Sequence, residues 1–205
     1  MTSLSLSEHT VVLATANKGK LREFAELLAG VGLAVRAQSE FGVLEAAETA
    51  PTFVENALIK ARHASRLTGL PALADDSGLE VDHLHGAPGV WSARYGGSGA
   101  SDQDNLRKLL AALAGVPADN RRARFVCLIV YLRHADDPTP VISQGVWEGS
   151  ILDEPRGANG FGYDPVFLVP ELDMTAAELT PEVKNRLSHR GKALRGLLAK
   201  LRGEV

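Results

Sequence analysis

The chain has 205 residues, of which 45% are hydrophobic and 23% charged, with a net charge of −3 at pH 7. This composition is typical of a globular protein with one large domain or two tightly packed lobes. The negative net charge argues against a general nucleic-acid-binding protein, which would carry a basic excess. No stretch approaches the ~20 apolar residues that a transmembrane helix needs, so we expect no membrane association.

The N-terminus and the cysteine content indicate where the chain acts. Residues 1–9 contain neither a basic segment nor a long apolar run, so we expect a disordered tail and not a signal peptide. Cys127 is the single cysteine, which excludes an intramolecular disulfide. Both features fit the reducing cytoplasm.

Strands and helices alternate in the first part of the chain. The apolar run over residues 11–14 predicts a buried strand, and apolar residues at offsets of 3, 4 and 7 predict a helix over residues 20–28. Gly30 and Gly32 are expected to end that helix, and residues 33–37 alternate like a second strand.

The next segment carries a clear helix start. Thr52 and Glu55 form a capping box, which predicts a helix that ends near Thr68, before Gly69. A short strand over residues 72–74 is then expected to run into the polar sequence Asp75-Asp76-Ser77-Gly78.

The second half of the chain contains two glycine-rich loops between regular elements. We expect, in order, a loop over 86–100, a helix over 101–114, strands over 123–132 and 141–152, a loop over 157–164, and a helix over 188–202. Together these elements predict an α/β fold with a mixed sheet and flanking helices.

The first candidate site follows the first strand: Thr15, Ala16, Asn17, Lys18, Gly19 and Lys20. A helix N-terminus presents unpaired amides and a positive dipole end, so it can bind phosphate. The spacing of a Walker A loop is absent. A polar, solvated turn explains the same residues without a ligand.

The second candidate site is the pair Asp75 and Asp76. Adjacent carboxylates after a buried strand are unfavourable unless something compensates their charge, and Mg²⁺ prefers carboxylate oxygens together with substrate phosphates. Upstream, Glu48 is favoured as a further ligand because Glu55 serves the capping box. An acidic turn without a metal remains the alternative.

The remaining candidates lie in the last third of the chain. Glycines in the 157–164 loop would allow a flat ligand to approach, with Phe161 as a stacking face and Asp164 as an acceptor. Lys184 and the sequence Ser188-His189-Arg190 add polar groups, and Ser188 is a good N-cap for the final helix. Core aromatics and surface charge would explain them equally well.

Taken together, these segments resemble one family, the inosine triphosphate pyrophosphatases of non-standard purine nucleotides, and most closely the bacterial dITP/XTP type. The segments that carry the resemblance are residues 12–20, 52–57, 74–79, 86–89 with 92–95, 160–165 and 188–190. Six motifs in the expected order cover nearly the whole chain.

The resemblance implies a catalytic domain over residues 10–205, with two lobes around a deep groove, usually a homodimer. It implies Mg²⁺-dependent hydrolysis of ITP, dITP or XTP to the monophosphate and pyrophosphate, which would keep these nucleotides out of DNA and RNA. Asp76 matches the proton acceptor and a metal ligand, and Glu48 is associated with metal; Asp75 is a further candidate ligand. The positions that match substrate contacts are Thr15 to Lys20, Ser77, Phe161, Gly162, Tyr163, Asp164, Lys184, His189 and Arg190.

This chain departs from its relatives at two positions. Ala16 stands where many relatives have glycine, so the loop must adopt a negative φ there or accept strain. Ala47 stands where relatives often carry an acidic residue, which leaves Glu48 as the carboxylate at that point.

Three other functions are alternatives for this sequence: a nucleotide-binding module without catalysis, a hydrolase of pyrimidine triphosphates, and a nucleic-acid-binding protein. The acidic pair argues against the first, since carboxylates without a catalytic task repel phosphates. The net charge argues against the last.

Overall fold

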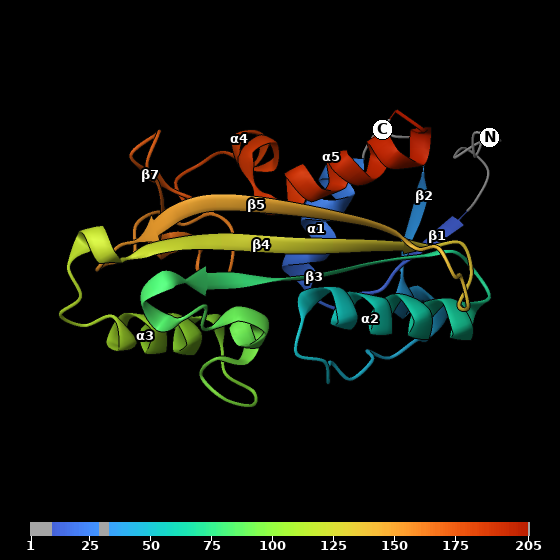
Figure 1. Cartoon of the computed structure of the whole chain (residues 1–205), viewed down its shortest axis with the longest axis horizontal. Helices are drawn as coiled ribbons and strands as arrows, with labels where there is room; N and C mark the ends of the chain where they lie inside the picture. Colours follow the sequence, from blue (N-terminus) through green and yellow to red (C-terminus); the bar gives the residue numbers. More distant parts are fainter. Residues whose placement is uncertain (1–9, 29–32, 205) are drawn as a thin grey trace. The chain divides into compact units, whose positions relative to one another are not determined.

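The structure is a computed structural model that describes residues 10–28 and 33–204 (Figure 1). The predicted tail over 1–9, and Gly30 and Gly32 as the end of the first helix, lie outside the described residues. The helices are α1 (Lys18–Leu28), α2 (Phe53–Thr68), α3 (Asp102–Ala112), α4 (Pro181–Leu187) and α5 (His189–Arg202).

The strands described form one seven-stranded sheet with the order β2-β1-β3-β4-β5-β6-β7. Their bounds are β1 (Thr10–Leu13), β2 (Ala34–Ala37), β3 (Ala72–Val81), β4 (Arg122–Leu132), β5 (Val141–Ile151), β6 (Phe167–Val169) and β7 (Met174–Thr175). β1 pairs in parallel with β2 and β3, whereas β6 is antiparallel to β5 and β7. The predicted α/β fold with a mixed sheet is therefore confirmed.

The chain divides into two compact units. Unit 1 comprises residues 1–76, 127–145 and 190–205, and unit 2 comprises residues 77–126 and 146–189. The boundary falls inside β3, between Asp76 and Ser77. A single catalytic domain over 10–205 stays a prediction.

Unit 1 has strands with a helix layer on each face (Figure 1). On one face, Phe24 of α1 and Leu194 and Leu197 of α5 pack against Leu13 and Ile129. On the other face, an alanine stripe of α2, formed by Ala57, Ala61 and Ala64, packs against the sheet. The residues of the sheet that it contacts are Val12, Ala14, Ala72, Ala74, Val130 and Leu132. Because these alanine side chains are small, the α2 backbone can lie close to the sheet. Polar residues of α2 can therefore reach polar residues of β3.

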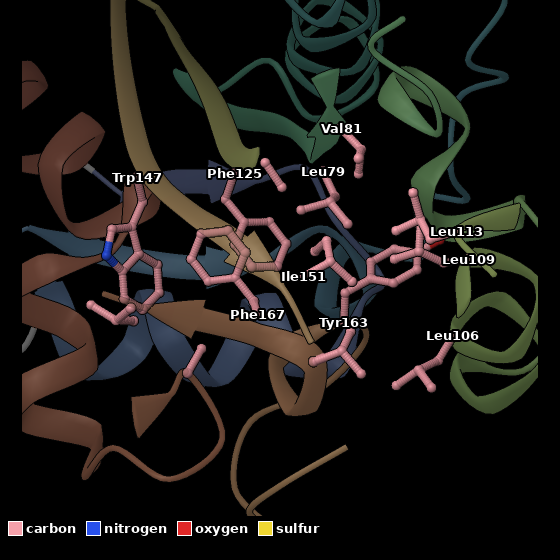
Figure 2. Packing of buried hydrophobic residues seen from close by; sticks show 14 of the residues in the cluster. Leu79, Val81, Leu106, Leu109, Leu113, Phe125, Trp147, Ile151, Tyr163 and Phe167 are labelled. Atoms are coloured by element: carbon pink, nitrogen blue, oxygen red, sulfur yellow. The ribbon is translucent and has the colours of Figure 1, made fainter. Parts of the chain in front are cut away.

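Unit 2 is built around aromatic residues. The ring centroids of Phe125 and Phe167 lie 4.5 Å apart, and Trp147 packs beside them (Figure 2). Leucines of α3 and Tyr163 extend the same cluster. This core therefore anchors the chain on both sides of the 157–164 loop.

Local signals mostly gave the right boundaries. Thr52 Oγ1 accepts the Glu55 amide, α2 ends at Thr68, and Gly69 follows in a left-handed conformation with φ 70°, all as predicted. The strand predicted over 72–74 was too short, because β3 continues through the two aspartates to Val81. Their side chains lie on a paired strand and not in a turn, which explains how both are buried.

Candidate active site

The loop between β1 and α1 is organised by its own side chains. Asn17 Oδ1 accepts the Lys20 amide at 3.0 Å, so Asn17 caps the start of α1. Thr15 is buried, and its Oγ1 accepts the Asn17 amide at 3.2 Å. Lys18 is exposed and Gly19 is half-buried. The predicted phosphate loop is therefore a capped helix N-terminus with a lysine at its rim.

Ala16 fits this loop without the backbone strain that a positive φ would cause. In the described part of the chain, only His85 and Asp173 combine a side chain with a positive φ. The Ala16 amide donates to Glu45 Oε1 at 2.9 Å. A carboxylate thus accepts from one of the amides expected to face phosphate.

Asp75 is fully buried on β3 and is surrounded by cations. Its Oδ2 lies 2.9 Å from Lys20 Nζ and 3.3 Å from Arg190 Nη2. Arg190 also pairs with Glu23 of α1. Burial alone would raise the pKa of Asp75, but Lys20, Arg190 and Lys60 outweigh it and hold that pKa far below its usual value. Asp75 is therefore an ionised anchor for two cations.

Asp76, the next residue, has a different environment. Its Oδ1 accepts from Lys60 Nζ at 3.2 Å, and Lys60 also donates to Glu48 Oε1 at 2.7 Å. Burial raises the pKa of Asp76 above its usual value, although Lys60 and Lys20 oppose the shift. When the surroundings shift the pKa values of two neighbouring carboxylates in opposite directions, the two groups typically have different roles in catalysis.

Lys60 is a functional candidate that the sequence interpretation missed. It is 8% exposed and lies on the buried face of α2, four residues after Asn56, which is also buried. The pKa of Lys60 is raised, because attraction to Asp76, Asp75 and Glu48 outweighs the effect of burial. A lysine within an alanine stripe was the available signal, since lysine is almost never buried unless it is paired.

The same cluster contains the only cysteine of the chain. Cys127 of β4 is fully buried, and its Sγ lies 4.0 Å from Asp75 Oδ2. Burial, with the nearby negative charge of Asp75, raises the pKa of Cys127 to about 12. The thiol therefore stays protonated and unreactive at neutral pH.

The donor chemistry fits a divalent ion in part. Glu48 and Asp76 already share one cation, the ammonium of Lys60, so their oxygens can converge on a positive charge. Asp75 fits less well because Lys20 and Arg190 take its Oδ2. Among the residues described, no three His, Cys, Asp or Glu side chains gather as a metal site. Such an ion would need phosphate oxygens as further ligands, which is how Mg²⁺ is usually held.

Unit 2 contains the other group of expected residues. Asp164 is 3% exposed, and its Oδ2 accepts from Lys184 Nζ at 2.6 Å and from the Phe161 amide at 2.8 Å. The Lys184 ammonium lies 5.1 Å from the centre of the Phe161 ring. A Cβ added at Gly160 would lie 2.0 Å from Asp164 Oδ2, so glycine is required there. Phe161, Asp164 and Lys184 thus form one contact group.

Three further predicted residues lie in unit 2. His189 is buried, and its ring stacks on Phe125 with centroids 4.8 Å apart. Tyr163 is buried, and its hydroxyl donates to the Ser92 carbonyl at 2.8 Å. Ser77 is half-buried on β3. His189 and Arg190, predicted as neighbours in one function, belong to different units.

A comparison with known proteins gives these residues a family. A sequence model described as the Ham1 family matches residues 11–200. A protein of Vibrio cholerae serotype O1 named dITP/XTP pyrophosphatase is 64% identical over 187 residues, covering 91% of this chain and 94% of that protein. A protein of the same name from Thioalkalivibrio sulfidiphilus is 60% identical over 193 residues, covering 94% and 98% of the two chains.

Solved structures agree with the sequence comparison. A HAM1 protein from Coxiella burnetii superposes with a TM-score of 0.88 at 51% identity, covering 96% of this chain and all of that one. The Staphylococcus aureus Ham1 protein gives a TM-score of 0.83 at 41% identity, with 96% and 100% covered. The predicted family resemblance is confirmed: the chain belongs to the Ham1 family.

Proposed function

We propose that this protein hydrolyses non-standard purine nucleoside triphosphates, namely dITP, XTP and ITP, to the monophosphate and pyrophosphate. The observation that carries the proposal is the divergence of Asp75 and Asp76, one held ionised by cations and the other with a raised pKa. Relatives that are 60–64% identical are named dITP/XTP pyrophosphatases, which supports the same reaction here.

Asp76 is the proposed proton acceptor. A general base works best when its pKa lies near the working pH, and the raised pKa of Asp76 moves it in that direction. It takes the proton of the attacking water, while pyrophosphate leaves. Lys60 contacts both Asp76 and Glu48, and its positive charge favours the ionised form of Asp76, which is the form that can accept a proton.

The triphosphate is proposed to bind the cations of unit 1. Lys18 and Lys20, with the α1 N-terminus, would supply positive charge to the phosphate oxygens. Asp75 holds Lys20 and Arg190 in fixed positions, so little reorganisation is needed when substrate arrives.

Mg²⁺ is the proposed cofactor, with Asp76 and Glu48 as its protein ligands. When bound, it would stabilise the charge that develops on the pyrophosphate leaving group. Asp75 remains a candidate ligand only through its second oxygen, because its Oδ2 is ion-paired.

The base is proposed to contact unit 2. Phe161 offers a stacking face, and Asp164 and Lys184 offer an acceptor and a donor beside it. Gly162 and Tyr163 complete the loop, with Ser77 and His189 as further contacts. Arg190 is the proposed donor to the 6-oxo group, which inosine and xanthosine carry and adenosine lacks; sites of this kind can reject the wrong base by ~10⁴ or more.

The experiment measures pyrophosphate release from ITP, XTP, dITP, ATP and GTP, each with Mg²⁺ and with EDTA. We expect release from ITP, XTP and dITP that EDTA abolishes, and little from ATP and GTP. Equal rates on all purines would overturn the selectivity, and no release from any would favour a binding module. UTP as a competitor tests the pyrimidine alternative.

A homodimer, the cytoplasm and one catalytic domain over 10–205 belong to the same proposal. The family resemblance supports all three. Among the helices described, none is long and apolar enough to cross a membrane. Light scattering of the purified chain tests the dimer, with twice the chain mass of 21.8 kDa as the expected result.

A further inference from the structure

The loop of unit 2 that contains Phe161 is bound to the start of helix α3. Asp102, the first residue of α3, accepts the amide of Gly162 at 2.8 Å through its Oδ2. The two residues are 60 positions apart in the chain. A carboxylate that accepts a backbone N–H makes a charge-assisted bond, which is shorter and stronger than a neutral one.

Asp102 is not needed to cap its own helix. Ser101 Oγ accepts the Asp104 amide at 3.2 Å, and Asp104 Oδ2 accepts the Ser101 amide at 2.9 Å, which is a complete capping box. The Asp102 carboxylate is therefore available for the loop, and its loss would leave the helix start intact.

The bond holds the loop at a glycine in the left-handed region. Gly162 has a φ of 60°, between the residue that offers the stacking face and the residue that enters the core. On one side, Phe161 is held through its amide on Asp164. On the other, Tyr163 is held through its hydroxyl on Ser92. The Phe161–Gly162 peptide is itself held on both sides, because its carbonyl accepts the Asp164 amide at 3.2 Å and its N–H donates to Asp102 at 2.8 Å. Without Asp102, only the longer of these two bonds would fix the peptide that carries Phe161.

We propose that Asp102 is a positioning residue that holds the Phe161–Asp164 turn in the orientation that accepts the purine base. The inference rests on the proposed function for the nucleoside-binding role of Phe161 and Asp164. Asp102 acts through the Gly162 amide and does not itself contact substrate. Its loss should therefore weaken nucleoside recognition and leave phosphate recognition unchanged.

The test compares Asp102→Ala, Asp102→Asn and the matched control Gln103→Ala, the next residue of α3, which is exposed. We expect Asp102→Ala to raise KM for ITP about tenfold with little change in kcat. Asp102→Asn keeps an oxygen acceptor and should recover most of the loss, and Gln103→Ala should match the wild type. Inorganic tripolyphosphate, which lacks a base, should inhibit all four proteins with the same Ki.

A second measurement follows amide hydrogen exchange over residues 157–164. We expect faster exchange in Asp102→Ala, near wild-type exchange in Asp102→Asn, and unchanged melting of the whole protein. An unchanged KM, a parallel rise in the tripolyphosphate Ki, or unchanged exchange would each overturn the inference. If the wild type releases no pyrophosphate, the proposed function fails, and the exchange measurement still decides whether Asp102 holds the loop.

Discussion

The ammonium of Lys60 donates to the carboxylate of Asp76 at 3.2 Å inside a buried charge cluster. Its positive charge lowers the pKa of Asp76 against the larger, opposite effect of burial. We expect Lys60→Met to raise that pKa further, which moves the acidic limb of the kcat/KM–pH profile upward by about one pH unit. Lys60→Arg keeps the charge and should leave the limb in place. A limb that does not move in Lys60→Met would contradict the assignment.

We expect Asp76→Asn to lower activity without lowering stability. We expect turnover to fall by about 10²–10⁴-fold, the usual contribution of a general base. Burial raises the folded-state pKa of Asp76 above its usual value, so ionisation of this carboxylate lowers the free energy of unfolding at pH values above that pKa. This loss of stability is removed as the pH falls through the folded-state pKa and the carboxylate becomes protonated. Melting at pH 7 should therefore be unchanged or higher. Asp119→Asn, at an exposed position, is the control. A near wild-type rate, or a clear loss of stability, would count against the proposed base.

We predict that Arg190 contributes both to stability and to base selectivity. It is 1% exposed and pairs with Glu23 and Asp75, so Arg190→Ala should cost about 3–5 kcal/mol of unfolding free energy, as expected when a buried ion pair loses one partner. If the guanidinium also contacts the 6-oxo group, the ratio of ITP to ATP hydrolysis should fall. If Arg190→Ala does not fold, the ratio of ITP to ATP hydrolysis is measured in Arg190→Lys, which keeps the charge. Glu23→Gln disturbs the same ion pair but keeps the arginine, so its ratio should stay at the wild-type value. Equal ratios in all variants would refute the contact.

We expect Glu45 to compete with phosphate for the first loop. Its carboxylate accepts the Ala16 amide at 2.9 Å, beside the N-terminus of α1. We expect Glu45→Ala to lower the Ki of inorganic pyrophosphate about threefold, because an amide is released and a negative charge removed. The gain should shrink at high salt, since the residue is exposed and its charge is screened. A Ki that stays constant at low salt would show that Glu45 does not oppose phosphate.

The sequence predicted what is encoded locally. The Thr52–Glu55 pair and Gly69 marked both ends of α2, because capping depends on residues three or four positions apart. It did not predict Lys60 as part of the site, because the partners of Lys60 lie 12 and 16 residues away and only the tertiary packing of α2 brings them together.

The last part of the chain gives a second example of features that local sequence signals did not predict. The helix α4 was missed because its seven residues are too few to show periodicity, although Thr180 and Pro181 mark its start. The contact between Lys184 and Asp164 depends on that helix. Family motifs named both residues without indicating that they form an ion pair, or that His189 stacks on a phenylalanine.

The burial of Cys127 makes this protein suitable for site-directed labelling. Since the chain carries a single cysteine, enclosed in β4 as a protonated thiol, a cysteine introduced on the surface would be the one group that reacts with maleimide in the native state. A fluorophore or spin label could then be attached without first removing the natural thiol, and substrate-dependent motion of either glycine-rich loop could be followed in an otherwise unaltered chain.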